Sequence, residues 1–155
     1  MIEAHNVSFS INGHQLLKKV SMQLRPGCFS AVLGKNGAGK STFLKALTGE
    51  LKPDAGEVRL DGQPLSDWPL RELARRRAVM MQQLQLAFGF TAFEVVMLGR
   101  MPHSNGFESA GDREIVRECM QQAGVGHLER RSFPTLSGGE KQRVQFARML
   151  AQLWD

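Results

Sequence analysis

Residues 34–41 read Gly-Lys-Asn-Gly-Ala-Gly-Lys-Ser, and the expected fold follows from this glycine-rich segment. It has the spacing G-x-x-x-x-G-K-[ST], and it lies between an apolar run at 28–33 and a helix-forming run at 42–48. Strand, glycine loop and helix in this order are the context that a phosphate-binding loop requires. Glycines let successive backbone N–H groups face one anion, and the N-terminus of the next helix adds partial positive charge. The stretch therefore predicts a site for the phosphates of a nucleotide.

Residue types within this loop suggest separate roles. The Lys40 ammonium can reach the β- and γ-phosphates, which makes it a candidate catalytic residue, and the Ser41 hydroxyl can ligate Mg²⁺. Thr42 is expected to contact the α-phosphate. A glycine-rich turn with a solvated lysine is the alternative, which the flanking strand and helix disfavour. The residues expected to hold the nucleotide are Gly34, Lys35, Asn36, Gly37, Ala38, Gly39, Lys40, Ser41 and Thr42.

Composition fits one globular domain with an ordinary core. The chain has 155 residues, of which 42% are apolar and 23% charged, as in typical soluble domains. No apolar run approaches the length of a membrane span and no signal pattern opens the chain, so a cytoplasmic location is expected. The two cysteines, Cys28 and Cys119, lack metal-ligand spacing and are expected to be reduced thiols.

The formal net charge of +5 admits two interpretations. It would suit nucleic acid or an anionic membrane surface, or it reflects a solvated surface rich in arginine. Because no long basic block is present, the second interpretation is favoured, and no nucleic-acid partner is predicted.

Patterning along the chain predicts an α/β fold. Strands are expected over 2–10 and 16–24, joined by a hairpin at Asn12-Gly13. A third strand, 28–33, would lead into the glycine loop. Further strands are expected over 57–60 and 78–81, the second of which would end at Gln82.

Two later helices begin with a recognisable sequence signal. Thr91 and Glu94 have the S/T-x-x-E spacing of a capping box, and so do Ser137 and Glu140. In such a box the hydroxyl and the carboxylate satisfy backbone N–H groups at the start of the helix. The second box belongs to the stretch Leu136-Ser137-Gly138-Gly139-Glu140-Lys141-Gln142-Arg143.

The loop at 34–41, Gln82 after an apolar run, and the stretch at 136–143 occur in this order. Together they resemble the ATP-binding subunits of ABC transporters, in which LSGGEKQR is the family signature, and the resemblance covers essentially the whole chain. It implies a phosphate-loop NTPase core with an antiparallel β layer and a helical subdomain. The implied division is 1–83 for the core and β layer, 84–135 for the helical subdomain, and 136–155 for the signature helix.

The resemblance also implies a head-to-tail homodimer that holds ATP and Mg²⁺. The signature residues Ser137, Gly138 and Gly139 of one chain would then contact the γ-phosphate of the ATP on its partner. Gln82 resembles the glutamine that ligates Mg²⁺ or orients a water, with Gln83 as the alternative in register. Without the resemblance, these residues read as a helix cap and a polar strand end.

The chain departs from the family pattern in two places. The aromatic residue that the family usually has after the first strand falls on Ile11, which offers apolar contact but no ring, and Phe9 is the nearest aromatic. The family's second acidic strand, catalytic glutamate and switch histidine would follow the signature helix, and no such motif follows Arg143. An incomplete family member with little hydrolysis of its own is therefore expected.

Residues 86–88 and 94–103 are similar to the branch that imports iron chelates, haemin or cobalamin, with haemin the first choice. The implied partners are integral membrane permease subunits and, indirectly, a periplasmic or surface solute-binding protein. The implied location is peripheral, on the cytoplasmic face of the inner membrane. Two rival functions stay open: a soluble ABC ATPase without a membrane partner, and a nucleotide-binding module that does not hydrolyse ATP.

Overall fold

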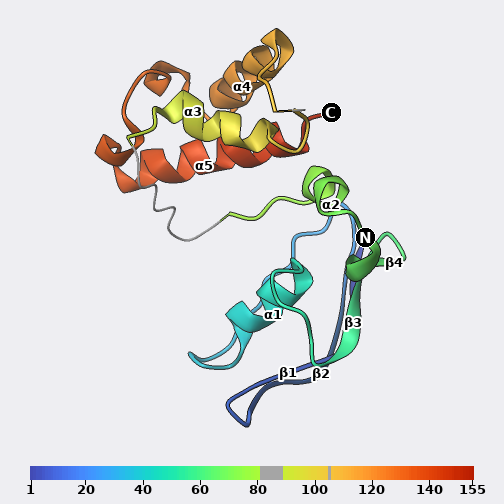
Figure 1. The fold of residues 1–155 in the computed structure, drawn as a ribbon. Coiled ribbons are helices and arrows are strands. Elements are labelled where there is room, and N and C mark those ends of the chain that lie inside the picture. The colour runs from blue at the N-terminus through green and yellow to red at the C-terminus, as the bar shows by residue number, and fades with distance from the viewer. Residues whose placement is uncertain (81–88, 105) are drawn as a thin grey trace. The chain divides into compact units, whose positions relative to one another are not determined.

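The computed structural model describes residues 1–80, 89–104 and 106–155, which form two compact units (Figure 1). Unit 1 is Met1–Pro69 and unit 2 is Leu70–Asp155. The candidates Gln82 and Gln83 lie outside the described residues, as does the stretch 86–88 that suggested the branch of the family. Their predicted roles therefore stay predictions.

Unit 1 is built on an antiparallel sheet with the strand order β2-β1-β3-β4. A hairpin joins the two long strands β1 (Ile2–Ile11) and β2 (His14–Leu24). Its turn residues Asn12 and Gly13 have φ of 49° and 78°, the positive values that the tight hairpin turn requires. The hairpin and the strands predicted over 2–10 and 16–24 are thus confirmed. The sheet is completed by β3 (Ala55–Leu60) and β4 (Gln63–Pro64), and a 3₁₀ turn, η1 (Leu65–Asp67), follows.

One helix covers one face of this sheet. Helix α1 (Lys40–Leu47) turns Phe43, Ala46 and Leu47 toward the strands. Its apolar residues are spaced three to four apart, so they share one side of the helix. The buried core of unit 1 comprises Ala4, Val7, Leu17, Phe43, Ala46, Leu47 and Val58.

Two predicted strands are absent from the described residues, and those predictions were wrong. Residues 28–33 and 78–80 take no strand conformation. Phe29 is 96% exposed and Leu33 is 88% exposed, so the apolar run before the glycine loop is not buried. A strand forms only where a neighbour accepts and donates its backbone hydrogen bonds. Within the described residues neither segment has such a neighbour.

Unit 2 is helical, and three of its helices share one core (Figure 1). Its elements are α2 (Leu70–Arg76), α3 (Ala92–Met97), η2 (Leu98–Arg100), α4 (Ala110–Gln122), η3 (Gly126–Leu128), η4 (Phe133–Thr135) and α5 (Gly138–Leu153). Helices α3 and α4 both pack against α5, around fully buried Val95, Val116 and Val144. Both predicted capping boxes are present: Thr91 caps α3 and Ser137 caps α5.

A buried ion pair anchors the C-terminal end of α5. The Arg100 guanidinium donates to Asp112 Oδ1 at 2.8 Å and to the carbonyl oxygens of Ala151 at 2.9 Å and Trp154 at 2.5 Å. The hydroxyl of Ser109 and the Arg100 guanidinium lower the pKa of Asp112 to about 2. A cation at the C-terminus of a helix also suits the helix dipole. Arg100 therefore ties α5 to α4 through buried, charge-assisted hydrogen bonds.

Candidate nucleotide site

The glycine loop runs directly into α1, and its last glycine is fixed by a close backbone approach. Gly39 has φ 81°, and a Cβ there would lie 2.6 Å from the carbonyl oxygen of Leu16. No other residue type fits this position without moving β2 or the loop. The last glycine of the motif thus has a local structural cause, which is the packing of the loop against the start of β2.

Lys40 is held by the loop that precedes it. Its ammonium donates to the carbonyl oxygens of Gly34 at 2.7 Å and Lys35 at 2.8 Å. The N–H of Ala38 also donates to the Lys35 carbonyl, at 3.2 Å. These bonds curl the loop around the lysine head group, which keeps the positive charge at the start of α1.

The N-terminus of α1 is suited to an anion. Among the described residues no side chain caps this end of the helix, and its first turn carries no acidic residue. The first N–H groups of a helix lack intrahelical partners, and they carry the positive end of the dipole. Together with the Lys40 ammonium they provide N–H donors and positive charge for phosphate oxygens.

A cavity of about 330 Å³ opens at the glycine loop. It is separate from a cavity of about 360 Å³ in unit 2. The structure brings most of the predicted phosphate ligands to the wall of the loop cavity. Gly34, Lys35 and Ala38 do not line it and instead shape the loop. Leu16 was not predicted, because nothing in the sequence of β2 marks it as a neighbour of the loop. The lining residues are Leu16, Asn36, Gly37, Gly39, Lys40, Ser41 and Thr42.

The predicted signature residues lie at the start of α5, in unit 2. Ser137 Oγ accepts from the N–H of Glu140 at 3.4 Å, and the N–H of Ser137 donates to Glu140 Oε2 at 2.7 Å. These bonds lower the pKa of the Glu140 carboxyl. Ser137, Gly138 and Gly139 are all exposed. They form a capped, accessible helix start, while the phosphate loop belongs to the other unit.

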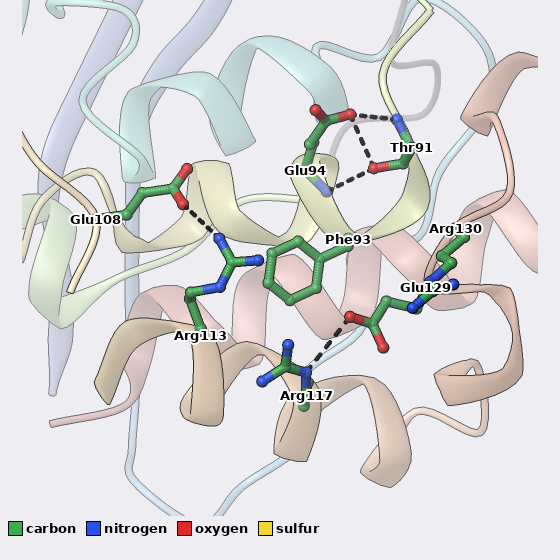
Figure 2. A pocket seen from close by; sticks show the side chains of 8 residues that line it. All are labelled: Thr91, Phe93, Glu94, Glu108, Arg113, Arg117, Glu129 and Arg130. Carbon is green, nitrogen blue, oxygen red and sulfur yellow. Dashed lines mark hydrogen bonds and ion pairs between the residues drawn. The ribbon is translucent and has the colours of Figure 1, made fainter. Parts of the chain in front are cut away.

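Unit 2 also carries the pocket shown in Figure 2, which sequence reasoning missed. We call it the Phe93 pocket, because two guanidinium groups lie over the Phe93 ring, with Arg113 at 5.0 Å and Arg117 at 5.6 Å from its centroid. Such cation–π contacts recur where arginine meets an aromatic face. The lining residues are Thr91, Phe93, Glu94, Glu108, Arg113, Arg117, Glu129 and Arg130.

Ion pairs hold both arginines of the Phe93 pocket in place. Arg113 donates to Glu108 at 3.2 Å, and Arg117 donates to Glu129 at 3.4 Å (Figure 2). The backbone N–H and the hydroxyl of Thr91 donate to Glu94, which lowers the pKa of that carboxyl. The Phe93 ring itself is buried in the core of unit 2, so the accessible lining of the pocket is charged and includes arginines, a residue type enriched at protein interfaces.

Other site classes have less support. Within the described residues, no cluster of three or more His, Cys, Asp or Glu side chains could hold a metal ion. No helix in the described parts of the chain is both long and apolar enough to span a bilayer. Cys28 and Cys119 are free thiols, and burial raises the pKa of Cys119 to about 11.

Comparison with known proteins gives consistent results. The family model described as ABC transporter matches residues 17–153. The chain is 54% identical to the Hemin import ATP-binding protein HmuV of Gloeobacter violaceus over 155 residues, which is 100% of this chain and 56% of that protein. It is 51% identical to the HmuV of Pseudomonas entomophila over 154 residues, 99% of this chain and 60% of that protein.

A solved structure extends the comparison to the fold. A dimeric ATP-binding cassette in a post-hydrolysis state, bound to ADP and Pi, matches with a TM-score of 0.81 and 30% identity, covering 98% of this chain and 70% of that one. The chain thus spans a little over half the length of the curated relatives named above. Its fold is that of a phosphate-loop NTPase of the ABC type, and the chain belongs to the ABC transporter family.

Proposed function

We propose that this chain is the ATP-binding part of an ABC importer that couples ATP hydrolysis to the uptake of an iron-chelate-type solute, with haemin as the first choice. One observation carries the proposal: a phosphate cavity at 36–42 and a capped signature helix at 137–140 occur in the same chain. The relatives named as hemin import proteins support the solute, and because the chain spans little more than half of them, the activity is proposed for the longer protein.

The phosphates would be held by the loop and by the first turn of α1. Backbone N–H groups of 36–40 would face the phosphate oxygens, and Thr42 would contact the α-phosphate. Lys40 would exchange its two loop carbonyls for the β- and γ-phosphates. Its positive charge would then oppose the charge that develops during phosphoryl transfer.

Mg²⁺ fits the same donor set. The Ser41 hydroxyl lines the cavity, and a hydroxyl oxygen is a hard ligand of the kind that Mg²⁺ prefers. Gln82 would add an amide oxygen or orient a water. When bound, Mg²⁺ would neutralise charge on the β- and γ-phosphates.

A head-to-tail homodimer would complete the site. Ser137, Gly138 and Gly139 of one chain would contact the γ-phosphate held by the loop of its partner. The exposure of these three residues and the solved dimer of a related cassette support this arrangement. Because ATP would bind the closed dimer more tightly than the open one, binding would close it and hydrolysis would reopen it.

The membrane partner would be the permease, bound through unit 2. The Phe93 pocket offers half-exposed Arg113 and Arg117 side chains above a buried ring, and arginine is enriched at interfaces. The chain would then lie peripherally on the cytoplasmic face of the inner membrane and respond to a solute-binding protein only indirectly. No nucleic acid is proposed as a partner.

Two measurements test the proposal. Titration of this chain with Mg·ATP should show saturable binding that Lys40→Ala removes, while Lys45→Ala on the same helix should leave it intact. In cells that depend on haemin as their iron source, deletion of the encoding gene should stop growth, and complementation should restore it. Growth of the deletion strain on haemin would refute the solute, and binding unaffected by Lys40→Ala would refute the site.

A further inference from the structure

A carboxylate of the same chain lies at the helix start that is proposed to meet the partner's ATP. Ser137 donates its backbone N–H to Glu140 Oε2 at 2.7 Å. The Glu140 side chain is only 21% exposed, so its charge lies against the first turn of α5. The N–H groups at a helix start are the donors that an external anion would use. One of these donors is therefore already bound by an internal anion.

Two further donors at this helix start are open. Among the described residues, no hydrogen bond engages the backbone N–H groups of Gly138 and Gly139. Both glycines are exposed, and a Cβ at either position would meet no atom within 4 Å. An oxyanion brought by a partner chain can thus reach these two donors, and it would then share the first turn of α5 with the Glu140 carboxylate.

The charge of Glu140 offsets positive potential at this point of the helix. Arg131 Nη1 lies 3.7 Å from Glu140 Oε1. The hydrogen bonds from Ser137 lower the pKa of the Glu140 carboxyl most, and the charges of Arg131 and Arg143 lower it further. The dipole of α5 adds partial positive charge. These sources of attraction for an incoming phosphate are therefore partly cancelled by the internal carboxylate.

We infer that Glu140 determines how much ATP the proposed dimer needs in order to close, because its carboxylate holds the anion position at the start of α5 until a phosphate of the partner's ATP displaces it. This rests on the proposed function, since it needs the contact between the start of α5 and the partner's nucleotide. ADP has no γ-phosphate to compete with the carboxylate. After hydrolysis Glu140 would therefore return to the Ser137 N–H and favour opening of the dimer.

The test removes the charge of Glu140 and keeps the helix cap. Glu140→Gln does this, because glutamine and glutamate both close a capping box. In the longer protein, the concentration of Mg·AMP-PNP, a non-hydrolysable ATP analogue, that gives half-maximal dimerisation by light scattering should fall about fivefold in about 20 mM NaCl. The gain should shrink to less than about twofold in about 0.5 M NaCl, because salt screens the charge.

Glu114→Gln is the matched control, since it removes an exposed carboxylate from α4 and changes the net charge equally. It should leave the half-maximal concentration unchanged within about twofold. Thermal unfolding of both variants should match that of the unaltered protein. A purely structural role of Glu140 predicts no gain in dimerisation, so the direction of the change separates competition from capping.

Each other result decides against a stated claim. An unchanged or raised half-maximal concentration in Glu140→Gln, a gain that persists in high salt, or an equal gain in Glu114→Gln would each overturn the competition by Glu140. Lys40→Ala tests the proposed function separately, because it should abolish dimerisation by Mg·AMP-PNP with either residue at position 140. If Lys40→Ala dimerises normally, the proposed function falls and the role of Glu140 with it.

Discussion

Two separate backbone constraints require glycine at position 39. Its φ of 81° disfavours any side chain, and a Cβ would also meet the Leu16 carbonyl oxygen at 2.6 Å. Gly37 has the same φ of 81° but has open space around it. Comparing alanine substitutions at Gly37 and Gly39 therefore distinguishes the cost of the unfavourable dihedral from the cost of the steric overlap.

Gly37→Ala should lower the free energy of unfolding of unit 1 by about 1 kcal/mol, because only the dihedral is unfavourable. Gly39→Ala should lower it by a further ~1–3 kcal/mol, because the loop or β2 must move. Urea unfolding monitored by hydrogen exchange in unit 1 measures both values. Equal losses would show that the contact with Leu16 does not constrain the loop.

Ionisation of Asp112 makes the stability of unit 2 depend on pH in the acid range. Its pKa lies at about 2 in the folded state, below the ordinary value of 3.8, so the ionised form is favoured by folding. The resulting stability is present above about pH 4 and is lost as the pH falls through the folded pKa. Unfolding of unit 2 should therefore become easier between about pH 4 and pH 2.

Asp112→Asn should remove this part of the pH dependence and lower stability at neutral pH by roughly 3 kcal/mol, because Arg100 loses its buried partner. Denaturant unfolding at a series of pH values measures the effect. Glu118→Gln, on the exposed side of the same helix, is the control and should keep the acid transition. A variant whose acid transition matched that of the unaltered chain would exclude Asp112 as its source.

Among the secondary-structure elements, helix caps and the hairpin turn could be predicted from neighbouring residues, whereas strands that need a distant partner could not. The capping boxes at Thr91 and Ser137 depend on residues three apart, so the sequence alone predicted them, and the structure contains both. The hairpin at Asn12 likewise follows from the dihedrals of two adjacent residues. The apolar runs at 28–33 and 78–81 predict strands that residues 28–33 and 78–80 do not form, because a strand depends on a distant partner that periodicity cannot reveal.

The candidate site divides in the same way. The loop cavity could be located from the sequence because most of its lining is contiguous in the chain, and its binding of phosphate stays a prediction. The Leu16 wall and the ring–guanidinium contacts of the Phe93 pocket join residues far apart in the chain. No periodicity or motif marks Arg113 and Arg117 as neighbours of Phe93. Long-range contacts of this kind become visible only once the helices are packed.

The Ser137 hydroxyl caps the start of α5, and it is also proposed to contact the ATP held by the partner chain. Ser137→Ala should cost about 1 kcal/mol of helix stability through loss of the cap, and Ser137→Asp should keep most of that stability because a carboxylate also caps. Both should lose ATP-dependent dimerisation in the longer protein, since neither presents a hydroxyl to a phosphate. Thermal unfolding and light scattering measure the two effects. Normal dimerisation of Ser137→Asp would refute the contact with the partner's ATP.

At the scale of the whole molecule, the two units have separate cores. Phe43 contributes to the core of unit 1 and Val116 to that of unit 2. Phe43→Ala should lower the free energy of unfolding of unit 1 by ~3–5 kcal/mol and leave hydrogen exchange in α4 and α5 unchanged. Val116→Ala should do the reverse, with a smaller loss. Loss of protection in both units from either change would mean that they unfold as one.

The bonds from Lys40 to the carbonyls of Gly34 and Lys35 have a consequence for ligand capture. A loop that already curves around an internal cation keeps its shape before any anion arrives. A triphosphate that bound as proposed would displace two carbonyl oxygens from Lys40 and would not have to order a disordered loop, so little chain entropy would be lost on association. Under the proposed function, Lys40 would keep the loop in its curved conformation until phosphate oxygens replaced the two carbonyls around its ammonium.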